Sequence, residues 1–113
     1  MSAPKIVSPP RNVHNKTGSF IAFSCEVSGF PVPSIEWKVD RGDGILIPLP
    51  TDDSHIAVQS RGGPSHYEVT SWLQLLEINV KDSATYWCIA KNNMGEASES
   101  ARLYVQDAAG ELF

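Results

Sequence analysis

Seven residues in the last third of the chain decide how it folds, and they read Asp82-Ser83-Ala84-Thr85-Tyr86-Trp87-Cys88. Successive side chains of a β-strand point to opposite faces of its sheet. In a strand, Tyr86 and Cys88 therefore share one face, and Trp87 lies on the other. The stretch predicts a strand with one buried face and a large aromatic side chain on the opposite face.

The rest of the chain repeats short apolar alternations separated by turn residues, and no segment keeps a helical period. This pattern is typical of an all-β sandwich. We expect strands at residues 6–7, 20–27, 35–39, 45–49, 55–59, 67–78, 84–91 and 97–105. Glycine, asparagine and aspartate mark the turns at 40–44, 61–64 and 92–95.

Composition places the chain among single globular domains. It has 113 residues, of which 42% are hydrophobic and 19% charged, and its net charge is -4. Its nine lysines and arginines are all separated from one another, which disfavours nucleic-acid binding through a basic stripe. No apolar stretch approaches the roughly 20 residues that span a bilayer, so we expect no membrane insertion.

The ends of the chain lack the pattern of the middle. We expect residues 1–3 to be linker or added residues, residues 4–106 to form the domain, and residues 107–113 to be a flexible tail. On this interpretation the chain is one domain of a longer protein.

Cys25 and Cys88 are the only cysteines, and in an intracellular protein both could be free thiols. The sequon Asn15-Lys16-Thr17 favours an oxidising, extracellular compartment instead. We expect a glycan on Asn15, and the alternative is an unused sequon.

Four residues together match the immunoglobulin pattern: Cys25, Trp37, Tyr86 and Cys88. The chain resembles that family, which implies an all-β sandwich of two antiparallel sheets joined by one disulfide between Cys25 and Cys88. It also implies that Trp37 packs against the sulfur atoms and that the Tyr86 hydroxyl bonds to the chain upstream. Such a disulfide closes a loop of about 60 residues and contributes roughly 2–4 kcal/mol.

The remaining core positions and the subtype follow from the same resemblance. Leu73 and Leu75 occupy positions that precede the tyrosine in this family and are expected in the core. The type that the chain resembles is the intermediate, or I-set, type, through Ala90, Asn92, Gly95 and the connection at 29–33.

Three further stretches resemble one particular module: residues 9–18, 55–64 and 68–72. They are similar to the C-terminal immunoglobulin module of secreted insulin-like growth factor-binding-related proteins, which also carry a cysteine-rich growth-factor-binding domain and a Kazal domain. Neither of those two domains is present in this chain, so the resemblance does not assign growth-factor binding to this module. The competing hypothesis is a muscle or cell-adhesion I-set module.

Strand alternation predicts a candidate binding surface around Trp87. Ile89 and Tyr104 should share its face, with Lys38 and Arg102 at the rim and Glu36 beside them. Aromatic side chains with charged surroundings are favoured at protein interfaces. The alternative is that Trp87 merely lies beneath the aliphatic stems of Lys38 and Arg102.

Two other features are weighed against ordinary structural roles. Trp72 and Leu76 should face outward on the other sheet, and we favour a packing role for Trp72. The tripeptide Arg41-Gly42-Asp43 is an integrin-recognition sequence in an expected exposed turn, but glycine and aspartate are also ordinary turn residues.

No catalytic or metal-binding pattern is present. His14, His55 and His66 lack metal-ligand spacing, and residues 52–55 offer too few ligands for a defined site. Serine, histidine and aspartate occur without a nucleophile-elbow motif. We therefore expect no enzyme activity, no cofactor and no metal.

The sequence thus predicts a secreted, non-enzymatic protein-binding module that contributes to growth-factor or cell-surface interactions. Its partner would be a growth factor, a cell-surface receptor or a second copy of the chain. The alternative is a structural spacer or cell-adhesion domain of a protein with several immunoglobulin modules, which could self-associate.

Overall fold

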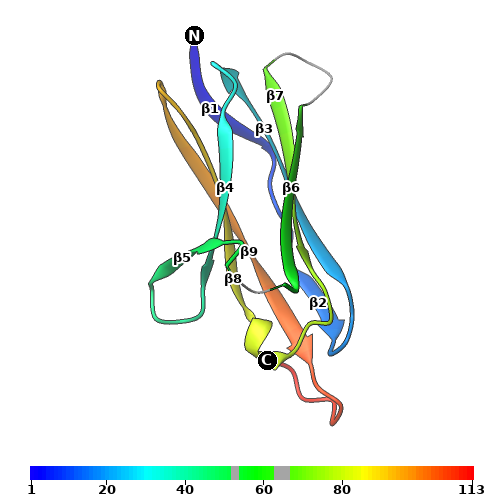
Figure 1. Cartoon of the computed structure of the whole chain (residues 1–113). Helices are drawn as coiled ribbons and strands as arrows, with labels where there is room; N and C mark the ends of the chain where they lie inside the picture. The colour runs from blue at the N-terminus through cyan, green and yellow to red at the C-terminus, as the bar shows by residue number, and fades with distance from the viewer. Residues whose placement is uncertain (52–53, 63–66) are drawn as a thin grey trace.

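The computed structural model describes residues 1–51, 54–62 and 67–113, which form two β-sheets packed face to face (Figure 1). The strands within these residues are β1 (Ser2–Ser8), β2 (Val13–Lys16), β3 (Ile21–Phe30), β4 (Ser34–Asp40), β5 (Leu46–Leu49), β6 (Ile56–Gly62), β7 (Glu68–Leu75), β8 (Ala84–Asn92) and β9 (Gly95–Gln106). A short 3-10 helix, η1 (Val80–Asp82), precedes β8. The predicted all-β immunoglobulin sandwich is confirmed.

One sheet has the strand order β1-β3-β7-β6 and the other has the order β2-β9-β8-β4-β5. Neighbouring strands are antiparallel, except that β2 runs parallel to β9 at the edge of the five-stranded sheet. The strand β2 has no counterpart among the strands expected from the sequence. Pro9 and Pro10 separate β1 from β2, and because proline cannot donate a ladder hydrogen bond, pairing with β3 stops there.

The core lies where the two sheets meet, around the predicted disulfide. Cys25 of β3 and Cys88 of β8 are bonded, with their Cα atoms 6.5 Å apart. Trp37, Leu73 and Leu75 are all fully buried in the same cluster. The disulfide and the inward positions that the resemblance implied are therefore present.

A buried hydrogen bond links the two sheets beside the disulfide. The Trp37 indole on β4 donates from Nε1 to Ser71 Oγ on β7, at 2.9 Å. Ser71 Oγ in turn donates to the Gln59 carbonyl of β6. An indole N–H buried without an acceptor would cost about 1–3 kcal/mol, and Ser71 supplies that acceptor.

Tyr86 closes the turn that precedes its own strand. Its hydroxyl donates to the Asp82 carbonyl at 2.6 Å, which is the upstream bond that the resemblance implied. Its ring lies 5.2 Å from that of Phe23 across the core. Burial, reinforced by the nearby Asp82 carboxylate, raises the pKa of the Tyr86 phenol well above its ordinary value.

The η1 turn is fixed by reciprocal capping, in which the Asn79 side chain accepts from Lys81 N and the Asp82 carboxylate accepts from Asn79 N. The other Asp82 oxygen lies 3.0 Å from Nε2 of His55, at the start of β6. Asp82 is buried, and these contacts satisfy its carboxylate. The expected strand at 67–78 therefore ends at Leu75, and a capped turn follows it.

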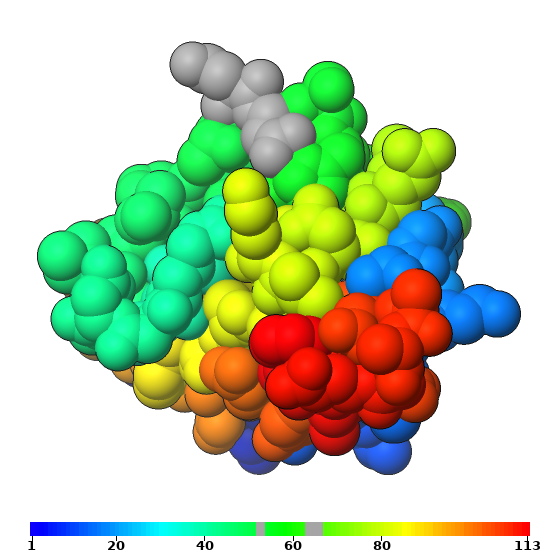
Figure 2. Space-filling model, turned by 90° about the horizontal axis from the view of Figure 1, so that it is seen from below, coloured from blue at the N-terminus to red at the C-terminus, as the bar shows by residue number. Residues whose placement is uncertain are grey.

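Both ends of the chain make hydrogen bonds with the strands of the sandwich. Ser2 and Ala3 belong to β1, where the Ser2 hydroxyl accepts a hydrogen bond from Phe30 N. At the other end, Val105 and Phe113 exchange backbone hydrogen bonds of 3.2 and 2.9 Å. The tail thus folds back on β9 and lies against that end of the sandwich (Figure 2).

Candidate functional site

The candidate site lies on the outer face of the five-stranded sheet, the side turned away from the four-stranded sheet. Trp87 on β8 pairs with Lys38 on β4 and with Ser100 on β9. Its chain neighbours Tyr86 and Cys88 are fully buried, whereas Trp87 is partly exposed. The alternation predicted from the opening stretch is therefore confirmed, with Trp87 on the outer side.

Arg102 and Tyr104 extend this surface along β9. The Arg102 guanidinium carbon lies 5.5 Å from the centre of the Tyr104 ring, within the range of a cation–π contact. Arg102 pairs with Thr85, two residues before Trp87 on β8, so it is a diagonal neighbour of Trp87. Lys38, Trp87, Arg102 and Tyr104 are all partly exposed, and we name these four residues the outer-face cluster.

Ile89 does not belong to the accessible surface. It points to the outer side but is only 6% exposed, so the accessible position expected for Ile89 is not observed, and its part in binding stays a prediction. Ile89 lies on the central strand of the sheet, opposite Glu36 on one side and Ser98 on the other. Alternation gave its direction correctly but not its burial.

The charges at the edge of the cluster are partly matched within the domain. Lys38 Nζ lies 3.2 Å from the Glu36 carboxylate on the same strand, and the two side chains are 25% and 48% exposed. A pair this open to solvent contributes only about 0–1 kcal/mol. Lys38 can therefore exchange Glu36 for an acidic group of a partner at little cost.

The side chains of the cluster are suited to non-covalent binding of another molecule. Two aromatic side chains present apolar area, and two cations stand beside them to meet acidic or aromatic groups. Among residues 1–51, 54–62 and 67–113, no group of three His, Cys, Asp or Glu side chains could hold a metal ion. That part of the chain also contains no helix with the length and apolar character of a membrane-spanning segment.

The two histidines among the described residues have separate environments. His14 is exposed on β2, and His55 contacts the buried Asp82. His66 and the aspartates Asp52 and Asp53 lie outside the described residues.

Trp72 occupies the outer side of the other sheet, as predicted. It lies on β7 between Ser24 of β3 and Gln59 of β6, and it is partly buried. Its partners are small or polar, and no cation–π contact involving it is found among the described residues. Trp72 therefore offers a natural comparison with Trp87, since the same side chain lies on the outer surface of each sheet.

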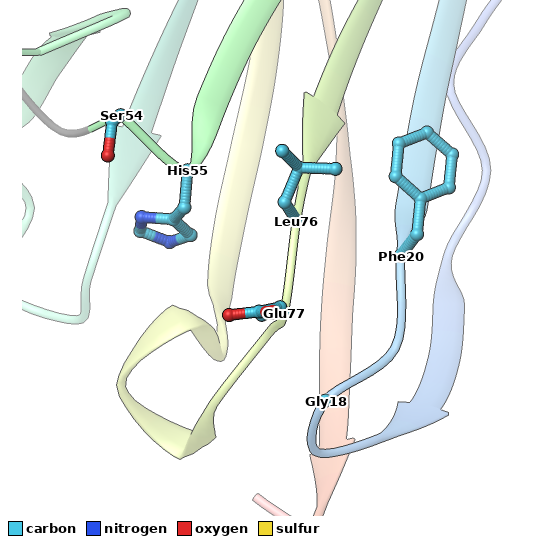
Figure 3. A pocket seen from close by; sticks show the side chains of 6 residues that line it. All are labelled: Gly18, Phe20, Ser54, His55, Leu76 and Glu77. Carbon is cyan, nitrogen blue, oxygen red and sulfur yellow. The ribbon is translucent and has the colours of Figure 1, made fainter.

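A hollow of about 390 Å³ opens near one end of the four-stranded sheet. Figure 3 shows Phe20, Leu76 and His55 around it, with Glu77 below them. Phe20 and Leu76 are both about half exposed, and the outward position predicted for Leu76 is observed. The mixed lining includes neither a nucleophile paired with a base nor a cluster of charge.

The tripeptide Arg41-Gly42-Asp43 follows β4 directly, and all three residues are exposed as expected. Asn15 lies on β2, where its side-chain oxygen accepts hydrogen bonds from Lys16 N and Ser19 Oγ. Its amide nitrogen, the atom that a glycan would modify, donates no hydrogen bond to any described residue.

Sequence reasoning missed Ser71 and the contact between His55 and Asp82. A signal for Ser71 existed, because Leu73 and Leu75 point inward and alternation places Ser71 on the same face. A buried hydroxyl there needs a partner, and Trp37 carries the matching donor. No comparable signal joined His55 to Asp82, which are 27 positions apart.

Comparisons with known proteins agree with this architecture. The immunoglobulin I-set domain matches residues 4–105. The chain is 64% identical over 109 residues to insulin-like growth factor-binding protein-related protein 1 of Cupiennius salei, a match that covers 96% of this chain and 42% of that protein. It is 50% identical over 104 residues to Kazal-type serine protease inhibitor domain-containing protein 1 of Mus musculus, covering 92% and 32%. The chain thus spans less than half the length of these relatives.

A solved structure of tandem Ig repeats of Dlar superposes with a TM-score of 0.77 at 26% identity, over 96% of this chain and 50% of that one. The two named relatives confirm the resemblance to growth-factor-binding-related proteins that was stated from residues 9–18, 55–64 and 68–72. The sandwich, its disulfide and the matched domain lead to one conclusion. The chain belongs to the immunoglobulin I-set domain family.

Proposed function

We propose that this chain is an extracellular, non-enzymatic protein-binding module of a secreted growth-factor-binding-related protein, and that it engages its partners through the outer-face cluster. One observation carries the proposal. Trp87 stands partly exposed on a strand whose inward residues are fully buried, and Lys38 and Arg102 stand on the strands to either side of it. The relatives' names support a growth factor as the partner.

The physical basis is surface burial with charge complementarity. Tryptophan, tyrosine and arginine are enriched among the residues that dominate binding energy at interfaces, and the cluster contains all three. The cation–π contact holds the Arg102 guanidinium against the Tyr104 ring, so less side-chain freedom is lost when a partner binds. The matching surface on a partner combines an apolar patch with acidic groups.

The test measures the affinity of insulin-like growth factor for the immobilised domain by biolayer interferometry. We expect Trp87→Ala to weaken binding at least tenfold, about 1.4 kcal/mol, because truncation of a central aromatic residue removes buried area. Trp72→Ala is the matched control, since it removes the same side chain from the other sheet, and it should leave affinity unchanged. Equal affinity for Trp87→Ala and the unmodified chain would reject the outer-face site.

A second candidate function is a spacer or adhesion module that associates with copies of itself. The likeness to tandem Ig repeats of Dlar favours it. Self-association through the same face would give a two-fold dimer. Sedimentation velocity over a range of concentrations distinguishes the two functions, because a domain that stays monomeric at the highest concentration is not a self-adhesive module.

A further inference from the structure

The loop between β4 and β5 carries the tripeptide Arg41-Gly42-Asp43 and is separate from the outer-face cluster. Arg41, Gly42 and Asp43 follow Asp40, the last residue of β4, and all three are exposed. Figure 1 shows the loop extending sideways from the two packed sheets, and Figure 2 shows the same segment projecting at the side of the molecule. A large receptor can therefore approach the tripeptide without meeting the rest of the sandwich.

The shape of the loop is set mainly by a residue outside the tripeptide. One Asp40 carboxylate oxygen accepts hydrogen bonds from Gly42 N at 2.8 Å and from Gly44 N at 3.1 Å. Gly42 and Gly44 both adopt positive φ, at 110° and 78°, a conformation that favours glycine. The turn is thus ordered before any partner binds, which lowers the entropic cost of binding.

The two charged side chains of the tripeptide remain available to a partner. Asp43 Oδ1 accepts from Ile45 N at 3.0 Å, and its second oxygen has no hydrogen-bond partner among the described residues. Arg41 Nη1 makes one long, exposed bond of 3.3 Å to the Lys81 carbonyl. Neither side chain is buried, and no ion pair joins them to each other within the described chain.

We propose that Arg41-Gly42-Asp43 is a binding site for a cell-surface receptor of the integrin type. The Asp43 carboxylate would coordinate a divalent cation held by the receptor, for which carboxylate oxygen is a preferred ligand. The Arg41 guanidinium would pair with an acidic pocket of the receptor in place of the Lys81 carbonyl. Gly42 provides the positive φ between them, at a point where the space around its α-carbon is open.

This site goes beyond the proposed function and uses different residues. The tripeptide lies beyond the end of β4, whereas the outer-face cluster lies on β4, β8 and β9 themselves. The affinity for a partner on the outer-face cluster and the affinity for a receptor on the loop therefore depend on different residues. Trp87→Ala should leave receptor binding unchanged, and a change in the loop should leave growth-factor binding unchanged.

The test measures binding of a purified integrin ectodomain that recognises this tripeptide to the immobilised domain in Mn²⁺ buffer. We expect saturable binding that EDTA abolishes and that an Arg-Gly-Asp peptide competes away, while an Arg-Gly-Glu peptide does not. Asp43→Glu should weaken binding about tenfold or more, because one added methylene displaces the carboxylate from the metal.

The control for this variant is Asp107→Glu, which makes the same change in another turn where the carboxylate also accepts backbone N–H bonds. It should bind like the unmodified domain. The peptide competition needs no variant, so it remains informative if Asp43→Glu disturbs the loop. Absence of integrin binding, or binding that survives both the peptide and EDTA, overturns the proposal.

Discussion

Trp37 and Trp87 lie on adjacent strands of one sheet and have opposite roles. Trp37 is 0% exposed, and its indole N–H is satisfied by Ser71 across the core. Trp87 pairs with Lys38, the residue next to Trp37, and faces outward with part of its ring exposed. One position along the strand thus separates a side chain that is buried in the core from one that stays partly open to solvent.

The same contrast holds for the polar atoms around each tryptophan. Around Trp37 the hydrogen bonds are internal, since Ser71 connects the indole to the Gln59 carbonyl. Around Trp87 the charges of Lys38 and Arg102 are partly exposed, and among the described residues the ion pair of Lys38 is the open one with Glu36. Removal of a hydrogen-bond partner from the interior therefore lowers the stability of the fold. On the outer face, a charged side chain can exchange its partner within the domain for a group of another protein.

The largest expected effect comes from truncation of the inner tryptophan. Trp37→Ala should lower the free energy of unfolding by about 3–5 kcal/mol, because it opens a cavity beside the disulfide. Urea denaturation followed by circular dichroism measures the change. A loss below about 1 kcal/mol would contradict the assignment of Trp37 to the core.

The disulfide comes next. Replacing Cys25 and Cys88 together with alanine should cost about 2–4 kcal/mol, because the unfolded chain regains the freedom of a 63-residue separation. Comparing the midpoints of chemical denaturation for the variant and the oxidised chain measures this cost. If the two curves coincide, the link between the sheets is not what holds them together.

Tyr86→Phe tests the buried side of the sheet through the pH dependence of stability. Loss of the bond to the Asp82 carbonyl should cost about 1–2 kcal/mol at neutral pH. The pKa of the phenol is raised in the folded state, mainly by burial, while the unfolded chain ionises near pH 10. The stabilisation by the Tyr86 hydroxyl is therefore complete below about pH 10 and is lost as pH rises above it. The difference in free energy of unfolding between the unmodified chain and Tyr86→Phe should then narrow. A gap that stays constant above pH 10 speaks against burial of the hydroxyl.

The smallest effect on stability is expected at the outer tryptophan. Trp87→Ala should change the free energy of unfolding by about 1 kcal/mol or less, because the side chain is already partly in contact with water. Differential scanning calorimetry of the Trp87→Ala and Trp72→Ala variants compares the two outer faces directly. A destabilisation as large as that of Trp37→Ala would show that Trp87 only packs.

Much of the fold could be predicted from local patterns. Alternation fixed the inward side chains of β8 and β7, and the spacing of the two cysteines, Trp37 and Tyr86 identified the sandwich. Contacts distant in sequence were missed. The strand β2 is only four residues long and pairs with β9 about 90 positions later, and nothing in Val13–Lys16 indicates that partner.

For the candidate site, the sequence predicted which way the side chains point but not how far they are buried. Periodicity states which way Ile89 points, but only the folded structure shows that it is buried. The hydrogen bonds of the tail could not be predicted for a related reason. Residues 107–113 carry no alternation, and nothing in them indicates the backbone bonds to β9, such as those between Phe113 and Val105.

The most direct test uses the tryptophans as reporters, since the chain contains three. In a chain labelled with ¹⁵N, each indole N–H gives its own NMR signal, and insulin-like growth factor is titrated in. We expect the Trp87 indole and the backbone signals of Arg102 and Tyr104 to shift, while the Trp37 and Trp72 indoles stay in place. Shifts confined to Trp72, or no shifts at saturating growth factor, would contradict recognition of the growth factor by the outer face of the five-stranded sheet.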